Sequence, residues 1–121
     1  MFKNYTLALS LIASISLSAV VHHVDTIAPY LSSKKVVIVK IYAPFLCKPC
    51  NSLAPEFQKA SNNFAQHNDI AFLEINGNKA KSLGVKNYPT VIIYKDGREV
   101  MRHVGSCSVS YITQAVTKAL Q

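Results

Sequence analysis

Apolar residues along the first half of the chain alternate between the spacings of strands and helices. Residues 35–42 (KVVIVKIY) form a nearly continuous run of Val and Ile, which is typical of a strand buried on both faces. Helical spacing of apolar residues then predicts a helix over about 47–66, which Pro55 should bend. Residues 70–75 (IAFLEI) predict a second strand. This order implies a parallel strand pair joined by a right-handed crossover.

The second half of the chain predicts a hairpin and a closing helix. Residues 90–94 and 99–104 are rich in β-formers and flank Asp96-Gly97, a dipeptide typical of tight hairpin turns. Ser108 is placed to cap a last amphipathic helix. One face of that helix collects its apolar residues, which are Ile112, Ala115, Val116 and Ala119.

Two short helices are expected between these elements. The first spans residues 26–31, with Asp25 as its cap and Pro29 in its first turn. The second spans residues 78–83 and ends at Gly84. Together, the elements predict an α/β domain with a mixed central β-sheet flanked by helices on both faces.

The N-terminal segment has the pattern of a targeting sequence. Lys3 precedes the uncharged, mostly apolar residues 6–17, and small residues suited to cleavage follow. An uncleaved membrane anchor is the alternative, because residues 5–21 fall only slightly short of the roughly 20 that a span needs. We therefore expect residues 1–19 to be a signal peptide or N-terminal membrane anchor. Residues 20–121 would then form one domain exported to the periplasm or cell envelope.

The distribution of the basic residues along the chain argues against a nucleic-acid partner. The 121 residues include 13 Lys and Arg against 6 Asp and Glu, which gives a net charge of +7. The basic residues are scattered and are not interleaved with aromatic residues, so they indicate a solvated surface. We expect a single-domain monomer.

Three cysteines are present, and two of them, Cys47 and Cys50, form a CxxC pair at the start of a predicted helix. Unpaired backbone N–H groups and the helix dipole favour a thiolate at this place. A disulfide that closes so short a loop stabilises a fold little. The four histidines are not arranged as ligands, so we assign no metal site. The spacing alone still leaves a metal clamp, a structural disulfide and a redox couple as alternatives.

The order of motifs resembles the thioredoxin family. The segments VVIVKIYAP, CKPC, LAPEF and GVKNYPT occur in that family's order, followed by the hairpin and Gly105. The fragments YAP, LAPEFQKA and GVKNYPT are similar to the catalytic domains of protein disulfide isomerase. The resemblance covers residues 24–121. It implies a thioredoxin fold and a thiol–disulfide oxidoreductase whose redox-active disulfide, Cys47–Cys50, needs no other cofactor.

The resemblance also assigns roles to the site residues. Cys47 is expected to attack as the nucleophile, and Cys50 to resolve the mixed disulfide. Lys48 and Pro49 lie between them and should tune the site, since a cation favours the thiolate and a proline stiffens the loop. The peptide bond before Pro89 should be cis.

A substrate groove is implied beside the cysteines. The resemblance places it along Tyr88, Pro89, Thr90 and Gly105, where the backbone pairs with an extended substrate segment. Substrates would be extracytoplasmic proteins with thiols or disulfides, and a membrane partner would recycle the cysteine pair. The small fold, with no inserted helical domain, favours a reductant. A disulfide-forming or isomerising oxidase is the alternative, and metal binding or delivery by the CxxC pair is an alternative of another class.

The sequence departs from the family pattern in three places. Leu46 stands where relatives carry an aromatic residue before the first cysteine. Lys40, which we also expect to tune the site, stands near the position of a buried carboxylate; it either pairs with Glu74 inside the sheet or extends to solvent at the sheet edge. Cys107 is either a third redox thiol or, as we favour, a small, partly buried residue before a helix cap.

Overall fold

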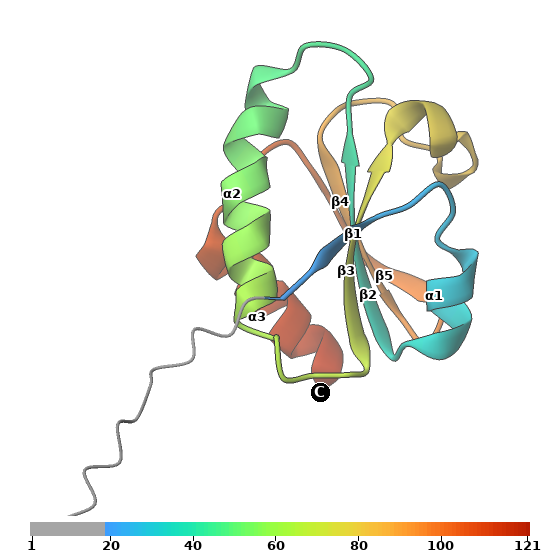
Figure 1. Cartoon of the computed structure of the whole chain (residues 1–121), viewed down its shortest axis with the longest axis vertical. Helices are drawn as coiled ribbons and strands as arrows, with labels where there is room; N and C mark the ends of the chain where they lie inside the picture. Colours follow the sequence, from blue (N-terminus) through green and yellow to red (C-terminus); the bar gives the residue numbers. More distant parts are fainter. Residues whose placement is uncertain (1–18) are drawn as a thin grey trace, which may run out of the picture.

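The computed structural model describes residues 19–121 as a five-stranded sheet with helices on both faces (Figure 1). Its strands are β1 (Val21–His23), β2 (Val36–Tyr42), β3 (Ile70–Asn76), β4 (Thr90–Lys95) and β5 (Arg98–Val104). The helices are α1 (Ala28–Ser33), α2 (Lys48–Asn62) and α3 (Val109–Leu120), with two 3₁₀ turns, η1 (Gly77–Lys79) and η2 (Lys81–Leu83). The expected leader lies outside the described residues, apart from Ala19.

The strands are arranged in the order β1-β3-β2-β4-β5. β2 runs parallel to β3 and antiparallel to β4, and β5 completes a hairpin with β4. This mixed sheet confirms the predicted fold class. The sequence did not predict β1, which pairs in parallel with β3 at one edge of the sheet.

β2 lies at the centre of the sheet and separates two apolar cores. Val36 and Ile38 pack with residues of α2 and α3, whereas Val37 and Val39 belong to the core on the opposite face. Successive side chains of a strand point to opposite faces, so a strand covered on both sides must be apolar throughout. Figure 1 shows α2 and α3 on one face, with α1 and the 3₁₀ turns on the other.

Two local predictions hold in detail. Asp96 and Gly97 have φ values of 50° and 80°, and positive values at both central residues are what a type I′ hairpin requires. The Ser108 hydroxyl accepts a hydrogen bond from the backbone N–H of Tyr111 at 3.1 Å and so caps α3. The turn connects β4 to β5, and the cap fixes the start of α3.

Three boundaries differ from the prediction. The N-cap of α1 is Ile27, not Asp25; Ile27 is buried, and its carbonyl accepts the N–H groups of Tyr30 and Leu31. Residues 78–83 lie in η1 and η2 rather than in one helix, although Gly84 does end η2 with a φ of 68°. α2 ends at Asn62, four residues early. Across residues 19–121, no helix combines the length and apolarity needed to cross a membrane.

Candidate active site

Cys47 and Cys50 form a disulfide at the N-terminus of α2, with their Cα atoms 5.3 Å apart. Cys47 is the N-cap of the helix, and its sulfur accepts a hydrogen bond from the Cys50 backbone N–H at 3.2 Å. Lys48 and Pro49 occupy the first helical positions and are exposed. A backbone donor at a helix N-terminus is therefore aimed at the Cys47 sulfur, which favours negative charge on that atom in the reduced protein.

The loop before β4 carries the expected cis peptide bond between Tyr88 and Pro89. Pro89 is buried, and its carbonyl accepts a hydrogen bond from the Gly105 N–H at 2.7 Å. Gly105 has a φ of 98°, a conformation that favours glycine. The Thr90 hydroxyl donates to the Asn87 carbonyl oxygen at 2.7 Å. Pro89 thus connects the segment Tyr88–Thr90 to Gly105, which lies in the loop after β5.

An open cleft of about 530 Å³ connects this loop to Cys47. Cys47, Lys48, Pro49 and Tyr88 all line it, so the structure brings these predicted residues together. Pro89, Thr90 and Gly105 do not line it, and they form the support behind Tyr88.

Phe45 is a component of the cleft that sequence reasoning missed. Its ring meets the Tyr88 ring edge-on with centroids 6.2 Å apart. Phe45 is 68% exposed, and its neighbour Leu46 is 89% exposed. The aromatic side chain expected directly before Cys47 is therefore supplied from one residue earlier, and the cleft has an exposed apolar wall.

Lys40 lies in the central strand and is buried, 6% exposed. Its Nζ is 3.1 Å from Oε2 of Glu74 on β3 and 5.4 Å from the centre of the Phe57 ring. The alternative of a Lys40 that reaches solvent at the sheet edge is wrong, because β2 has a neighbour on each side. Lys40 and Glu74 line a second cavity, of about 330 Å³, together with Cys50.

Cys107 is a free, half-buried thiol packed against the core under α3. Burial raises the pKa of this thiol, and the nearby Glu56 carboxylate raises it further. Cys107 lines neither of the two cavities that Cys47 lines. Its surroundings match the favoured interpretation of a partly buried small residue and disfavour the thiolate.

The fold and the site together define a thioredoxin-fold protein with a CxxC disulfide beside a cis-proline loop. The sequence profile of the Thioredoxin family matches residues 19–118. Rice chloroplastic thioredoxin F is 35% identical over 99 residues, which cover 76% of this chain and 50% of the relative. The thioredoxin of Mycoplasma genitalium is 35% identical over 78 residues, 61% of this chain and 72% of the relative. The chain belongs to the thioredoxin family.

Other relatives extend the comparison. A putative protein disulfide-isomerase of Schizosaccharomyces pombe is 29% identical over 79 residues, 62% of this chain but only 16% of the relative. Relative to the rice and fission-yeast proteins, the chain therefore spans half of the length or less. The crystal structure of spinach thioredoxin F superposes with a TM-score of 0.72 at 24% identity, covering 87% of this chain and 97% of that one. That similarity establishes the fold.

Proposed function

We propose that this protein is a thiol–disulfide oxidoreductase that exchanges its Cys47–Cys50 pair with the thiols and disulfides of other proteins. The observation that carries the proposal is the disulfide at the head of α2, next to an open cleft lined by Tyr88. Family membership supports it, since thioredoxins are oxidoreductases of this kind. The cysteine pair itself carries the electrons, so we propose no other cofactor.

The reaction begins with the Cys47 thiolate. It attacks one sulfur of a substrate disulfide in line with the S–S bond, which gives a Cys47–substrate mixed disulfide and releases the first substrate thiolate. Cys50 then attacks the Cys47 sulfur, closes the Cys47–Cys50 disulfide and releases the second substrate thiolate. Two electrons pass from the dithiol to the substrate. The reverse sequence oxidises a substrate dithiol.

The cleft supplies the binding surface for a protein substrate. Phe45, Leu46 and Tyr88 give it an apolar side, and Lys48 and Lys86 give it positive charge. An extended substrate segment would lie along the Tyr88–Thr90 loop and pair with its backbone, in the manner of strand addition. Only a protein substrate uses this surface, because a small disulfide needs access to Cys47 alone.

In the cell, we propose a monomeric reductant of extracytoplasmic proteins, held in the periplasm or cell envelope and recycled by a membrane partner. The uncharged apolar stretch at residues 6–17 supports export, and the small single-domain fold supports a reductant. Cell fractionation with an antibody to the folded domain tests the location. Recovery of the protein with cytosolic markers alone would contradict it.

An oxidising or isomerising role is the second candidate. Lys48 supports it, because a cation next to Cys47 stabilises the reduced thiolate and makes the couple more oxidising. The similarity to a putative protein disulfide-isomerase supports it as well. The metal-binding alternative has no such support, since within residues 19–121 no three His, Cys, Asp or Glu side chains are grouped to hold an ion.

The reduction potential of the Cys47–Cys50 couple separates the first two roles. A value near about −270 mV supports the reductant, and a value near about −120 mV supports the oxidase. The activity itself is tested by turnover of a protein disulfide, which Cys47→Ser should abolish. Retention of activity in Cys47→Ser would contradict the proposed function.

A further inference from the structure

The cavity next to Cys50 is lined by an ion pair, between the buried Lys40 and the partly exposed Glu74, that the exchange reaction described above does not use. The titratable side chains lining this cavity are Lys40, Tyr42, Cys47, Cys50 and Glu74. The cavity measures about 330 Å³, which is ample for several water molecules at about 30 Å³ each. A proton that leaves the Cys50 thiol therefore has Lys40 and Glu74 as the charged groups within reach of cavity water.

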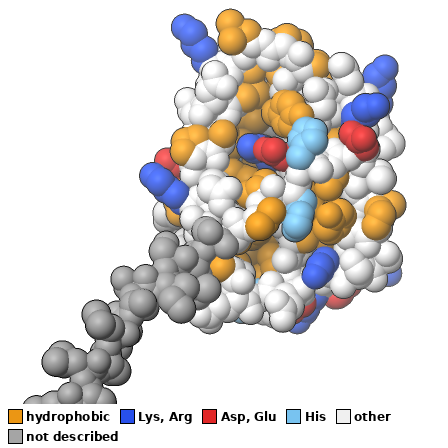
Figure 2. All heavy atoms as spheres, in the orientation of Figure 1, with side chains coloured by type: hydrophobic (Ala, Val, Ile, Leu, Met, Phe, Trp, Pro, Cys, Tyr) orange, Lys and Arg blue, Asp and Glu red, His pale blue; other side chains and the backbone are white. Residues whose placement is uncertain are grey.

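Glu74 connects this cavity to the protein surface. One carboxylate oxygen, Oε2, lies 3.1 Å from Lys40 Nζ, and the other, Oε1, lies 3.6 Å from Nδ1 of His23. The side chains become more exposed along this series, from 8% for Lys40 through 31% for Glu74 to 56% for His23. Figure 2 shows histidine, acidic and basic side chains next to one another on the β1 side of the molecule.

His23 is placed by β1, the strand that the sequence did not reveal. β1 pairs with β3 so that His23 lies opposite Glu74, and β2 pairs with β3 so that Lys40 lies opposite Glu74 from the other side. The Tyr42 hydroxyl lies 3.5 Å from His23 Nδ1. The groups facing Glu74 are thus Lys40 and Tyr42 from β2, His23 from β1, and the cysteine pair from α2 across the cavity.

We propose that the Glu74 carboxylate is the proton acceptor for Cys50 during resolution of the mixed disulfide, and that His23 passes this proton to solvent. The proposal rests on the thiol–disulfide exchange proposed above. Lys40 acts as a positioning residue, since it holds the carboxylate at the inner end of the cavity. The register of β1, β3 and β2 builds the complete path from Cys50 to the surface.

The step balances as follows. The Cys50 thiol gives its proton through cavity water to Glu74, and the resulting thiolate attacks the Cys47 sulfur. The Cys47–Cys50 bond forms, the Cys47–substrate bond breaks, and the bonding electrons leave with the substrate sulfur, which is protonated by solvent. Glu74 then returns to the carboxylate as its proton moves to the His23 imidazole and on to bulk water. Oxidation of a substrate dithiol runs these transfers in reverse.

The experiment follows the two halves of the exchange separately. The reduced full chain carrying Cys107→Ala is mixed with one equivalent of dithiobis-nitrobenzoate. Attack by Cys47 releases a first thionitrobenzoate, and attack by Cys50 on the mixed disulfide releases a second. We expect Glu74→Gln to slow the second release at least roughly tenfold at pH 7 and to leave the first within about twofold. The difference should shrink as the pH rises, because hydroxide ion then removes the Cys50 proton without help from a carboxylate.

Three further variants keep the outcome interpretable. Glu74→Gln leaves Lys40 buried without its partner, so Lys40→Gln combined with Glu74→Gln provides a folded, uncharged counterpart that should show the same slow second release. Asp69→Asn removes an exposed acid of equal charge and should change neither phase. His23→Gln should slow the second release in dilute buffer, and added imidazole should restore it.

An unchanged second release in both Glu74 variants would overturn the proposal. Equal slowing of both releases would also overturn it, because it would indicate a general disturbance of the site. Loss of the first release in the parent chain would instead contradict the proposed exchange function itself. The two failures are therefore distinguishable in one trace.

Discussion

Gly77 packs directly against the ring of Tyr88, and a Cβ atom added at Gly77 would lie 2.5 Å from Cζ and Oη of that ring. No two such atoms approach this closely, so a side chain at position 77 must displace Tyr88. The glycine is buried at the start of η1, directly after β3. The position of the cleft wall next to Cys47 therefore depends on a residue without a side chain.

We expect Gly77→Ala to move Tyr88 and disturb the cleft. Overpacking of this kind costs about 1–3 kcal/mol of stability. Turnover of a protein disulfide should fall more than turnover of a small disulfide, because in the proposed mechanism only the protein substrate binds in the cleft. The measurement is a thermal melt and a pair of turnover rates.

The matched control removes the ring that is displaced. In a Tyr88→Ala background, Gly77→Ala should have little further effect on either rate, since the conflicting atoms are gone. An equal loss with and without the Tyr88 ring would show that the glycine acts in another way.

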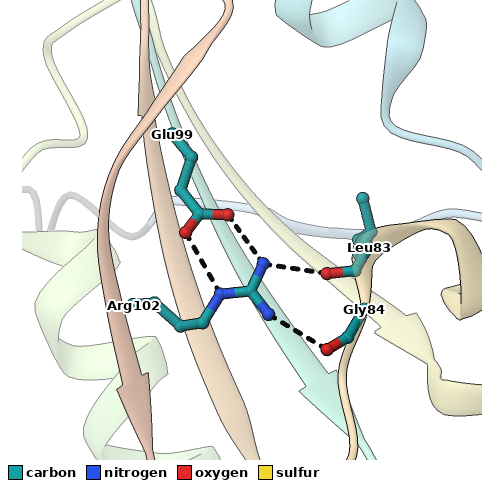
Figure 3. A network of polar contacts seen from close by, with 4 residues as sticks. All are labelled: Leu83, Gly84, Glu99 and Arg102. Atoms are coloured by element: carbon teal, nitrogen blue, oxygen red, sulfur yellow. Dashed lines mark hydrogen bonds and ion pairs between the residues drawn. The ribbon is translucent and has the colours of Figure 1, made fainter.

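Arg102 connects the outer strand to the segment that precedes the cis-proline loop. Its guanidinium donates to both Glu99 oxygens, at 2.7 and 3.1 Å, and to the carbonyl oxygens of Leu83 at 2.8 Å and Gly84 at 3.3 Å (Figure 3). The hydrogen bond to Glu99 raises the pKa of Arg102, so the guanidinium group stays charged. Arg102 thus fixes the end of η2 against β5.

We expect Arg102→Gln to lower the free energy of unfolding by roughly 1 kcal/mol, because a neutral amide cannot make all the hydrogen bonds of the charged guanidinium group. Hydrogen exchange over residues 84–88 should become faster. Arg98→Gln, an exposed arginine on the same strand, is the control and should leave both unchanged. Equal exchange in the two variants would show that Arg102 does not hold this segment.

The Lys40–Glu74 pair gives an asymmetric prediction for stability. Glu74→Ala leaves a Lys side chain of 8% exposure without its partner, whereas Lys40→Met leaves a carboxylate of 31% exposure that can reach water. We expect Glu74→Ala to destabilise the protein by about 3 kcal/mol and Lys40→Met by less. Urea melts of both variants check the order. A larger loss in Lys40→Met would contradict the buried position of the lysine.

The central fold could be predicted from the sequence because its signals are local. The run KVVIVKIY is apolar on both faces because both faces are covered, and Asp96-Gly97 provides the positive φ values of the turn. The cysteine spacing and the Tyr88-Pro-Thr90 motif located the site by resemblance.

The remaining features depend on tertiary contacts. β1 has three residues, two of them exposed histidines, so no period of two can be recognised in it. The contact of His23 with Glu74 follows from the register of β1 and could not be predicted without that strand. The start of α1 was misplaced because a buried Ile27 outweighs a capping side chain at Asp25. Gly77 carries no local signal, since its contact with Tyr88 spans the loop between β3 and β4.

Cys107 is expected to be dispensable for exchange. Its pKa is raised, so little thiolate forms at pH 7, and alkylation of the oxidised protein should be slow until the pH passes the ordinary thiol value of about 8.5. Cys107→Ala should keep nearly the full rate of protein-disulfide turnover. A large loss of activity, or a Cys107 disulfide in the purified protein, would place this thiol in the site.

The raised pKa of Cys107 also makes the stability of the protein depend on pH. A thiol whose pKa is raised by folding holds its proton more tightly in the folded state, so its contribution is complete below the unfolded pKa and is lost as pH rises through the folded pKa. The parent should therefore lose stability at alkaline pH more steeply than Cys107→Ala. Melts at pH 7 and pH 10 check the difference. Parallel curves would show that Cys107 titrates as a free thiol.

The attacking cysteine can be identified directly by trapping the mixed disulfide. Reduced Cys50→Ser is incubated with a disulfide-containing protein, and the covalent complex is digested and mapped by mass spectrometry. The Cys47 sulfur accepts a hydrogen bond from the Cys50 backbone N–H at the N-terminus of α2, which favours its thiolate. We therefore expect the substrate to be joined to Cys47, and we expect Cys47→Ser to trap almost no substrate. A complex joined through Cys50 in Cys47→Ser, with none through Cys47 in Cys50→Ser, would contradict the exchange mechanism.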